Sequence, residues 1–155
     1  TKQYTCGSGS IGATALKTAA ANCDLTFIQA IALGILCNAL VCLAVWLTFS
    51  ARTTVDRVVS ISLPIAAFVA AGFEHSIANM YFIPIGLFIK DFDPAFTAAV
   101  AGQIPSLGKL TWQAFVLRNL LPVTIGNIIG GTVLVAAVYW MVYLRPAAAA
   151  GKEQG

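Results

Sequence analysis

The sequence is poor in charge. Only 10% of its 155 residues are Asp, Glu, Lys or Arg, whereas 59% are hydrophobic. A soluble domain of this size needs more polar surface to cover its core, so the composition argues against an ordinary soluble protein. The net charge of +3 is small and spread over loops and tail, which excludes a basic face for nucleic acid. The composition therefore predicts a membrane protein, and its long uncharged runs predict an all-α one.

Ligands for metals and redox groups are also scarce. The chain has one histidine, His75, and its four cysteines form no CxxC pair. Haem, iron–sulfur and zinc sites need several such ligands, so we expect no cofactor and no metal, and a redox-enzyme membrane subunit is disfavoured. No nucleophile, base and orienting group can be placed together, so we expect no enzyme. Cys6 and Cys23 remain candidates for a disulfide outside the membrane.

Two uncharged runs are long enough to cross a bilayer. Residues 27–49 and 120–144 contain no charged side chain. At about 1.5 Å per residue, each helix reaches across a hydrocarbon core of about 30 Å. In the second run Gly126 and Gly130 form a GxxxG pair, which indicates a tight helix contact rather than a chemical site. Both runs are predicted to be transmembrane helices.

Basic residues orient these helices. Arg52 and Arg57 follow the first run and Arg145 follows the second, so the positive-inside rule places both flanks in the cytoplasm. Proline and glycine favour an irregular loop over 90–119. The start of the chain has no initiator Met and no signal pattern, which favours an internal fragment. The predicted segments outside the membrane are 1–26 and 90–119 on the extracytoplasmic side, and 50–57 and 145–155 in the cytoplasm.

The apolar segment 58–89 is too long for one straight span, because as a single helix it would measure roughly 48 Å. Gly72 lies near its middle, beside a polar cluster that includes Glu74 and His75. A break in the helix is tolerated at this depth only where it is buried in protein or lines a wet cavity. A proline-kinked packing helix is the alternative. The predicted half-helices are 58–71 and 77–89.

Glu74 and His75 need a reason to lie in an apolar run, because an ionisable side chain costs about 2.5 to 3.5 kcal/mol to insert. A histidine can attract an anion when protonated, or exchange a proton with a weak acid. We therefore expect an anion channel with His75 at its centre. Alternatively, the imidazole only satisfies the helix break by hydrogen-bonding Glu74, Asn38, Asn79 or Asn127. Glu74 is expected to hold backbone donors or a neighbouring subunit, since a second charge in the pore would repel anions.

The stretch GFEHSIANM at 72–80 resembles the signature of the formate/nitrite transporter family. The stretches GILCNALVCLAVW at 34–46 and LPVTIGNIIGG at 121–131 resemble the fourth and sixth helices of that family, so the resemblance covers 16–145. It implies an aquaporin-like inverted-repeat helical bundle in homopentamers of the bacterial cytoplasmic (inner) membrane. This chain would be the second three-helix repeat, with a broken middle helix, and the N-terminal half of the same protein would be its partner.

The resemblance also implies residue roles and a substrate. His75 matches the central pore histidine and Phe68 the outer apolar constriction, while Asn22 stands where the family usually has a lysine. Formate is the expected anion, although nitrite and hydrosulfide channels share the histidine motif. A neutral-solute channel of aquaporin type normally has paired Asn-Pro-Ala sequences, and none occurs here. The candidate pore residues are His75, Phe68, Asn38, Val41, Asn79 and Asn127, with Glu74 and Gly72 as structural residues beside them.

Overall fold

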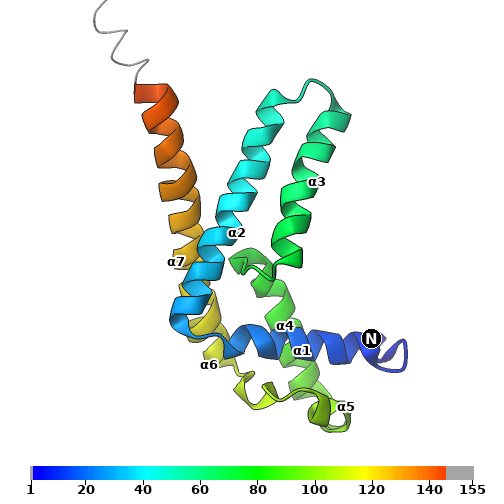
Figure 1. The fold of residues 1–155 in the computed structure, drawn as a ribbon. Coiled ribbons are helices and arrows are strands. Elements are labelled where there is room, and N and C mark those ends of the chain that lie inside the picture. The colour runs from blue at the N-terminus through cyan, green and yellow to red at the C-terminus, as the bar shows by residue number, and fades with distance from the viewer. Residues whose placement is uncertain (1, 146–155) are drawn as a thin grey trace, which may run out of the picture.

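The computed structural model describes residues 2–145, and every regular element in that range is a helix (Figure 1). The prediction of an all-α fold is confirmed. Three π-helical segments, Phe115–Leu120, Gly130–Ala137 and Trp140–Leu144, extend the last two α-helices into one continuous helix from Trp112 to Leu144. The α-helices are α1 (Ser10–Asp24), α2 (Phe27–Leu47), α3 (Thr54–Ala70), α4 (Ser76–Phe92), α5 (Pro94–Val100), α6 (Trp112–Ala114) and α7 (Leu121–Ile129).

Within the part of the chain that the structure describes, two helices are long and apolar enough to cross a membrane. They are Phe27–Ser50, which contains α2, and the continuous helix Trp112–Leu144. The first starts at a capping box, in which the Thr26 hydroxyl and the Gln29 side chain each accept from the other residue's backbone amide. This cap satisfies backbone donors that the first helical turn leaves open, and it explains why α2 begins at Phe27.

Glycines bring α2 and α7 into close contact. A Cβ atom added at Gly126 would meet the backbone carbonyl oxygen of Ile31, and one at Gly130 would meet that of Ile35. A Cβ at Gly34 would lie 2.8 Å from the carbonyl oxygen of Val123. The backbones touch because these positions carry no side chain, so the tight contact predicted from the GxxxG pair is confirmed.

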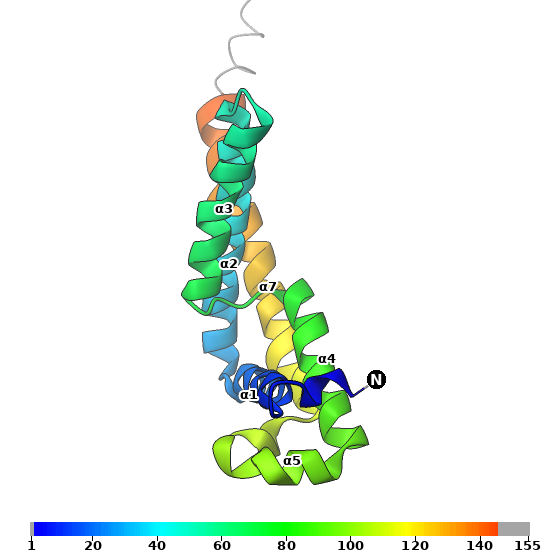
Figure 2. The ribbon, with the colours of Figure 1, turned by 90° about the vertical axis from the view of Figure 1, so that its right-hand side faces the viewer.

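The middle apolar segment is broken, as predicted. The backbone amides of Gly72 and Phe73 donate to the carbonyl oxygens of Val69 and Phe68, both over 3.1 Å, which is the hydrogen-bond pattern of a Schellman motif at the end of α3. Gly72 has φ +67°, a left-handed conformation that costs least for glycine. Figure 2 shows the result: α4 lies to one side of the line of α3.

The segments 2–26 and 90–119 contain more helix than their sequences predicted. The stretch 1–26 contains α1, which lies crosswise against α4 in both views (Figures 1 and 2). The irregular loop predicted over 90–119 was wrong for much of its length, because the side chains of Asp93 and Thr111 cap α5 and α6 and start helices there. Cys6 is exposed and Cys23 is buried, and both are free, so the suggested disulfide is not formed. The core between these elements includes Leu16, Ile83, Leu87 and Leu110.

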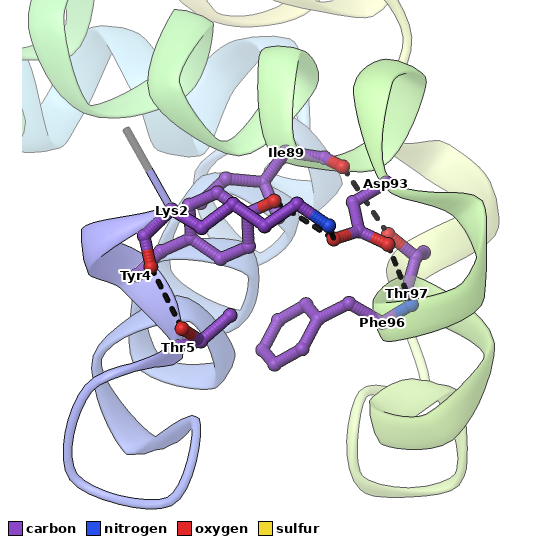
Figure 3. A network of polar contacts seen from close by, with 7 residues as sticks. All are labelled: Lys2, Tyr4, Thr5, Ile89, Asp93, Phe96 and Thr97. Carbon is purple, nitrogen blue, oxygen red and sulfur yellow. Dashed lines mark hydrogen bonds and ion pairs between the residues drawn. The ribbon is translucent and has the colours of Figure 1, made fainter.

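Lys2 and Tyr4 hydrogen-bond to Asp93, in the turn between α4 and α5 (Figure 3). Lys2 Nζ and Tyr4 Oη donate to Asp93 Oδ2 over 3.1 and 2.8 Å, and the backbone amide of Phe96 donates to Asp93 Oδ1 over 3.1 Å. The Tyr4 ring also meets the Phe96 ring edge-on, with 5.4 Å between centroids. Led by the Phe96 amide, these donors lower the pKa of Asp93. The short helical turn Gln3–Thr5 therefore packs against the start of α5.

Candidate functional site

An open pocket of about 190 Å³ lies at the break between α3 and α4. It combines aromatic, amide, carboxylate and imidazole side chains, which is the mixture of apolar wall and few polar groups typical of a small-ligand site. Its lining residues are Thr18 and Asn22 from α1, Phe68 and Val69 from α3, Gly72, Phe73, Glu74 and His75 from the break, and Ala78, Asn79 and Phe82 from α4.

His75 is the N-cap residue of α4. Its Nδ1 atom accepts a hydrogen bond of 3.3 Å from the backbone amide of Ala78. A neutral imidazole that accepts at Nδ1 carries its proton on Nε2, so this cap selects the tautomer with an Nε2–H donor. Within residues 2–145 the ring makes no other hydrogen bond, so the alternative in which it bonds Glu74 or a nearby asparagine is wrong for the described chain.

Phe68 lies beside this imidazole. The two ring centroids are 6.1 Å apart and the ring planes differ by 31°. Phe68 occupies the last turn of α3 and His75 begins α4, so the break brings them together. An apolar ring next to the only histidine restricts the water that reaches it, which strengthens any hydrogen bond formed there.

Glu74 is buried, with 6% of its surface exposed, and side-chain amides hold it. Its Oε2 atom accepts from Asn79 Nδ2 over 2.5 Å and from Asn119 Nδ2 over 2.9 Å. Asn79 also donates to Asn119 Oδ1 over 2.8 Å and accepts from Asn22 Nδ2 over 3.3 Å. Both N–H groups of Asn79 are therefore committed, and it lines the pocket without a free donor. Glu74 was expected to hold backbone donors or a neighbouring subunit, and in the described residues it accepts from amide side chains.

Asn127 forms a second amide centre behind the break. Its Nδ2 donates to the carbonyl oxygens of Gly34 and Glu74 over 2.9 and 3.0 Å, and its Oδ1 accepts from both the amide and the hydroxyl of Ser76 over 3.0 Å. Asn38 donates to the Asn127 carbonyl oxygen. These hydrogen bonds hold the break against α2 and α7. Asn127 and Asn38 therefore fix the position of the break although they do not line the pocket.

The structure thus separates the predicted residues into two groups. Those that line the pocket are His75, Phe68, Gly72, Glu74 and Asn79, and those that lie outside its lining are Asn38, Val41 and Asn127. Val41 is half-buried on α2.

Sequence reasoning missed Thr18 because it did not predict α1. It missed Asn119 because that residue was assigned to a loop next to Arg118. The signal for Asn119 was a lone amide immediately before an uncharged run.

The chemistry available in the pocket is that of hydrogen-bond donation to a small solute. The Nε2–H of His75 and the hydroxyl of Thr18 have no partner within residues 2–145. In the same described range, no group of three His, Cys, Asp or Glu side chains is placed to hold a metal ion. Two amides hold Oε2 of Glu74, and the donors that remain open in the pocket, on His75 and Thr18, suit a small anion as acceptor.

Comparison with known proteins places this geometry in a family. The model of the formate/nitrite transporter family matches residues 1–141. The formate channel FocA of Escherichia coli K12 is 49% identical over 144 residues, which cover 92% of this chain and 50% of FocA. The probable formate transporter of Methanothermobacter thermautotrophicus is 42% identical over 134 residues, which cover 86% of this chain and 42% of the relative.

A solved structure gives the same result for the fold. A chain described as a pentameric formate channel with formate bound is similar, with a TM-score of 0.81 and 44% identity over 93% of this chain and 57% of that one. These relatives are named as channels or transporters rather than enzymes. The chain spans about half the length of the curated relatives it matches. It belongs to the formate/nitrite transporter family, a family of membrane proteins.

Proposed function

We propose that this protein conducts small monovalent weak-acid anions, with formate as the main substrate, across the bacterial cytoplasmic membrane. The observation that carries the proposal is the pocket at the α3–α4 break, where the Nε2–H of His75, beside Phe68, has no partner among the described residues. The names of the similar proteins, which are formate channels, support the choice of anion.

In this mechanism the two ring systems act in sequence. An anion that passes Phe68 loses part of its water shell, because an apolar constriction offers no replacement hydrogen bonds. The Nε2–H of His75 then supplies one, and a protonated ring would supply charge as well. Proton transfer requires the imidazolium form, in which Nδ1 also carries a proton and no longer accepts from the Ala78 amide. That form can pass its Nε2 proton to formate, which leaves as neutral formic acid, and the neutral ring then takes up a proton from the solution. Either route lowers the barrier for a charge in a low-dielectric pore.

A complete pore needs more helices than the described part of this chain contains. Aromatic and aliphatic side chains of α4 remain exposed, including Tyr81, Phe82 and Phe88. The relatives are about twice as long, and the similar solved structure is pentameric. We infer that a preceding three-helix repeat of the same protein covers this face to complete one pore per protomer, and that the protein assembles as a homopentamer.

Selectivity among anions is the second part of the proposal. Nitrite and hydrosulfide are alternative substrates, because each is a small monovalent weak-acid anion that can accept from the Nε2–H of His75. Neutral solutes are disfavoured, since a titratable ring at the break confers no advantage on a solute that never carries charge.

Counter-flow uptake into proteoliposomes tests both points. With the full-length protein and equal concentrations of labelled formate, nitrite and hydrosulfide, we expect formate uptake to be the fastest and glycerol uptake to match protein-free liposomes. Faster nitrite or hydrosulfide uptake would move the substrate assignment within the family. Uptake of glycerol without uptake of any anion would contradict the proposed function.

A further inference from the structure

Glu74 and His75 are neighbours in the chain and line the same pocket, yet no hydrogen bond joins their side chains in the described residues. Oε2 of Glu74 instead accepts from the amides of Asn79 and Asn119. Through this one oxygen, the Glu74 carboxylate is held by amide donors and not by the imidazole. This separation needs a cause, because a carboxylate and an Nε2–H donor attract each other strongly in a buried place.

Asn119, on the long helix Trp112–Leu144, supplies that cause. It is completely buried, at 0% exposure, in the π-helical segment Phe115–Leu120. Its two N–H groups donate to Glu74 Oε2 over 2.9 Å and to the Asn22 carbonyl oxygen over 3.0 Å, and its Oδ1 accepts from Asn79. A π-helical turn inside a long helix redirects side chains and often marks a functional position. Asn119 thus ties the long helix, α1 and the break to one carboxylate.

This arrangement prevents Glu74 from competing with formate for the hydrogen-bond donor of His75. Formate is a carboxylate, and so is the side chain of Glu74, so both accept from the same kind of donor. A group tethered by a short chain has an effective concentration in the millimolar range or above. A Glu74 carboxylate released from its amides would therefore compete directly with formate for the Nε2–H of His75.

We propose that Asn119 is a positioning residue that withholds Glu74 from His75 and so keeps the imidazole donor available to a passing anion. The proposal rests on the proposed function, since it requires an anion that binds at His75. It assigns Asn119 an effect on the apparent affinity for formate rather than on the maximal transport rate.

The first test replaces Asn119 by leucine, which has the same number of side-chain heavy atoms and the same branching but no polar atom. In proteoliposomes with the full-length protein, we expect the half-saturation concentration for formate uptake to rise about three- to tenfold, with a maximal rate close to that of the unaltered protein. Adding Glu74→Gln to Asn119→Leu should return the half-saturation concentration towards the original value, because a neutral amide competes poorly with a carboxylate. Thr97→Val is the matched control. It removes a buried hydroxyl on α5 that donates to the Ile89 carbonyl oxygen, and Thr97 does not line the pocket.

A second pair of variants covers the case in which leucine prevents folding. Asn119→Asp keeps the size and polarity of the side chain but repels Glu74, so it should raise the half-saturation concentration at least as much as leucine does. Glu74→Gln should restore it here as well. An unchanged half-saturation concentration, or a rise that Glu74→Gln does not reverse, would overturn the proposal. An equal rise in Thr97→Val, or a fall in maximal rate that follows loss of assembled protein, would also overturn it. Absence of formate uptake by the unaltered protein would overturn the proposed function instead.

Discussion

Replacing Gly126 by alanine is expected to destabilise the protein, although alanine is the better helix former. Helix propensity alone would make the change favourable by about 1 kcal/mol. The new methyl group, however, meets the backbone carbonyl oxygen of Ile31 on α2, and a carbonyl in a helix cannot move aside as a flexible side chain can. Separating the helices loses their contact along the whole α2–α7 interface, so we expect a net loss of about 2 kcal/mol.

The measurement is the midpoint of thermal unfolding of the full-length protein in detergent. Gly102→Ala is the control, because a Cβ at Gly102 meets no atom within 4 Å. The control should leave the midpoint nearly unchanged, while Gly126→Ala lowers it by several degrees. A midpoint for Gly126→Ala equal to or above that of the unaltered protein would show that α2 and α7 do not approach as closely as described.

Replacing His75 by phenylalanine is expected to change formate flux and to remove its pH dependence between pH 5 and 8. Phenylalanine keeps an aromatic ring in place but removes the Nε2–H donor, and these 155 residues contain no other histidine to titrate in this range. The lost donor would stabilise an anion by about the energy of a charge-assisted hydrogen bond, so formate uptake at acid pH should fall about tenfold or more.

The same change also removes the cap of α4, because Nδ1 no longer accepts from the Ala78 amide. His75→Asn separates the two effects: asparagine is a favoured N-cap residue, but it does not titrate. Both variants should assemble, and both should lose the pH dependence of uptake measured in proteoliposomes. Retention of the original flux and pH profile in His75→Phe would remove the role given to the imidazole.

Much of the fold followed from charge and periodicity. The uncharged run at 27–49 corresponds to α2, and Gly72 with its polar neighbours predicted the break that separates α3 from α4. These features are local, because a span needs length without charge and a break needs a residue tolerant of left-handed φ. Local signals of the same kind, the caps at Asp93 and Thr111, were present but were outweighed by nearby proline and glycine.

The site was only partly predictable for a different reason. His75 stood out because a lone imidazole in an apolar run has few structural explanations. Asn79 and Asn119 are separated from Glu74 by 5 and 45 positions in the sequence. Whether their side chains meet Glu74 depends on how the helices pack. The hydrophobic periodicity of the sequence does not report which polar side chains hydrogen-bond across helices. The amide network around Glu74 is therefore seen only in the three-dimensional structure.

The central claim is that a break in the middle helix lets the His75 ring meet the transported anion. Solid-state NMR tests it directly, with ¹⁵N-histidine-labelled full-length protein in lipid and ¹³C-formate at saturating concentration, and with His75→Phe identifying the signals of this ring. We predict a dipolar contact between the formate carbon and Nε2 of His75, with the proton of the neutral ring on Nε2. A protein that transports formate while this nitrogen shows no contact with it would contradict the claim.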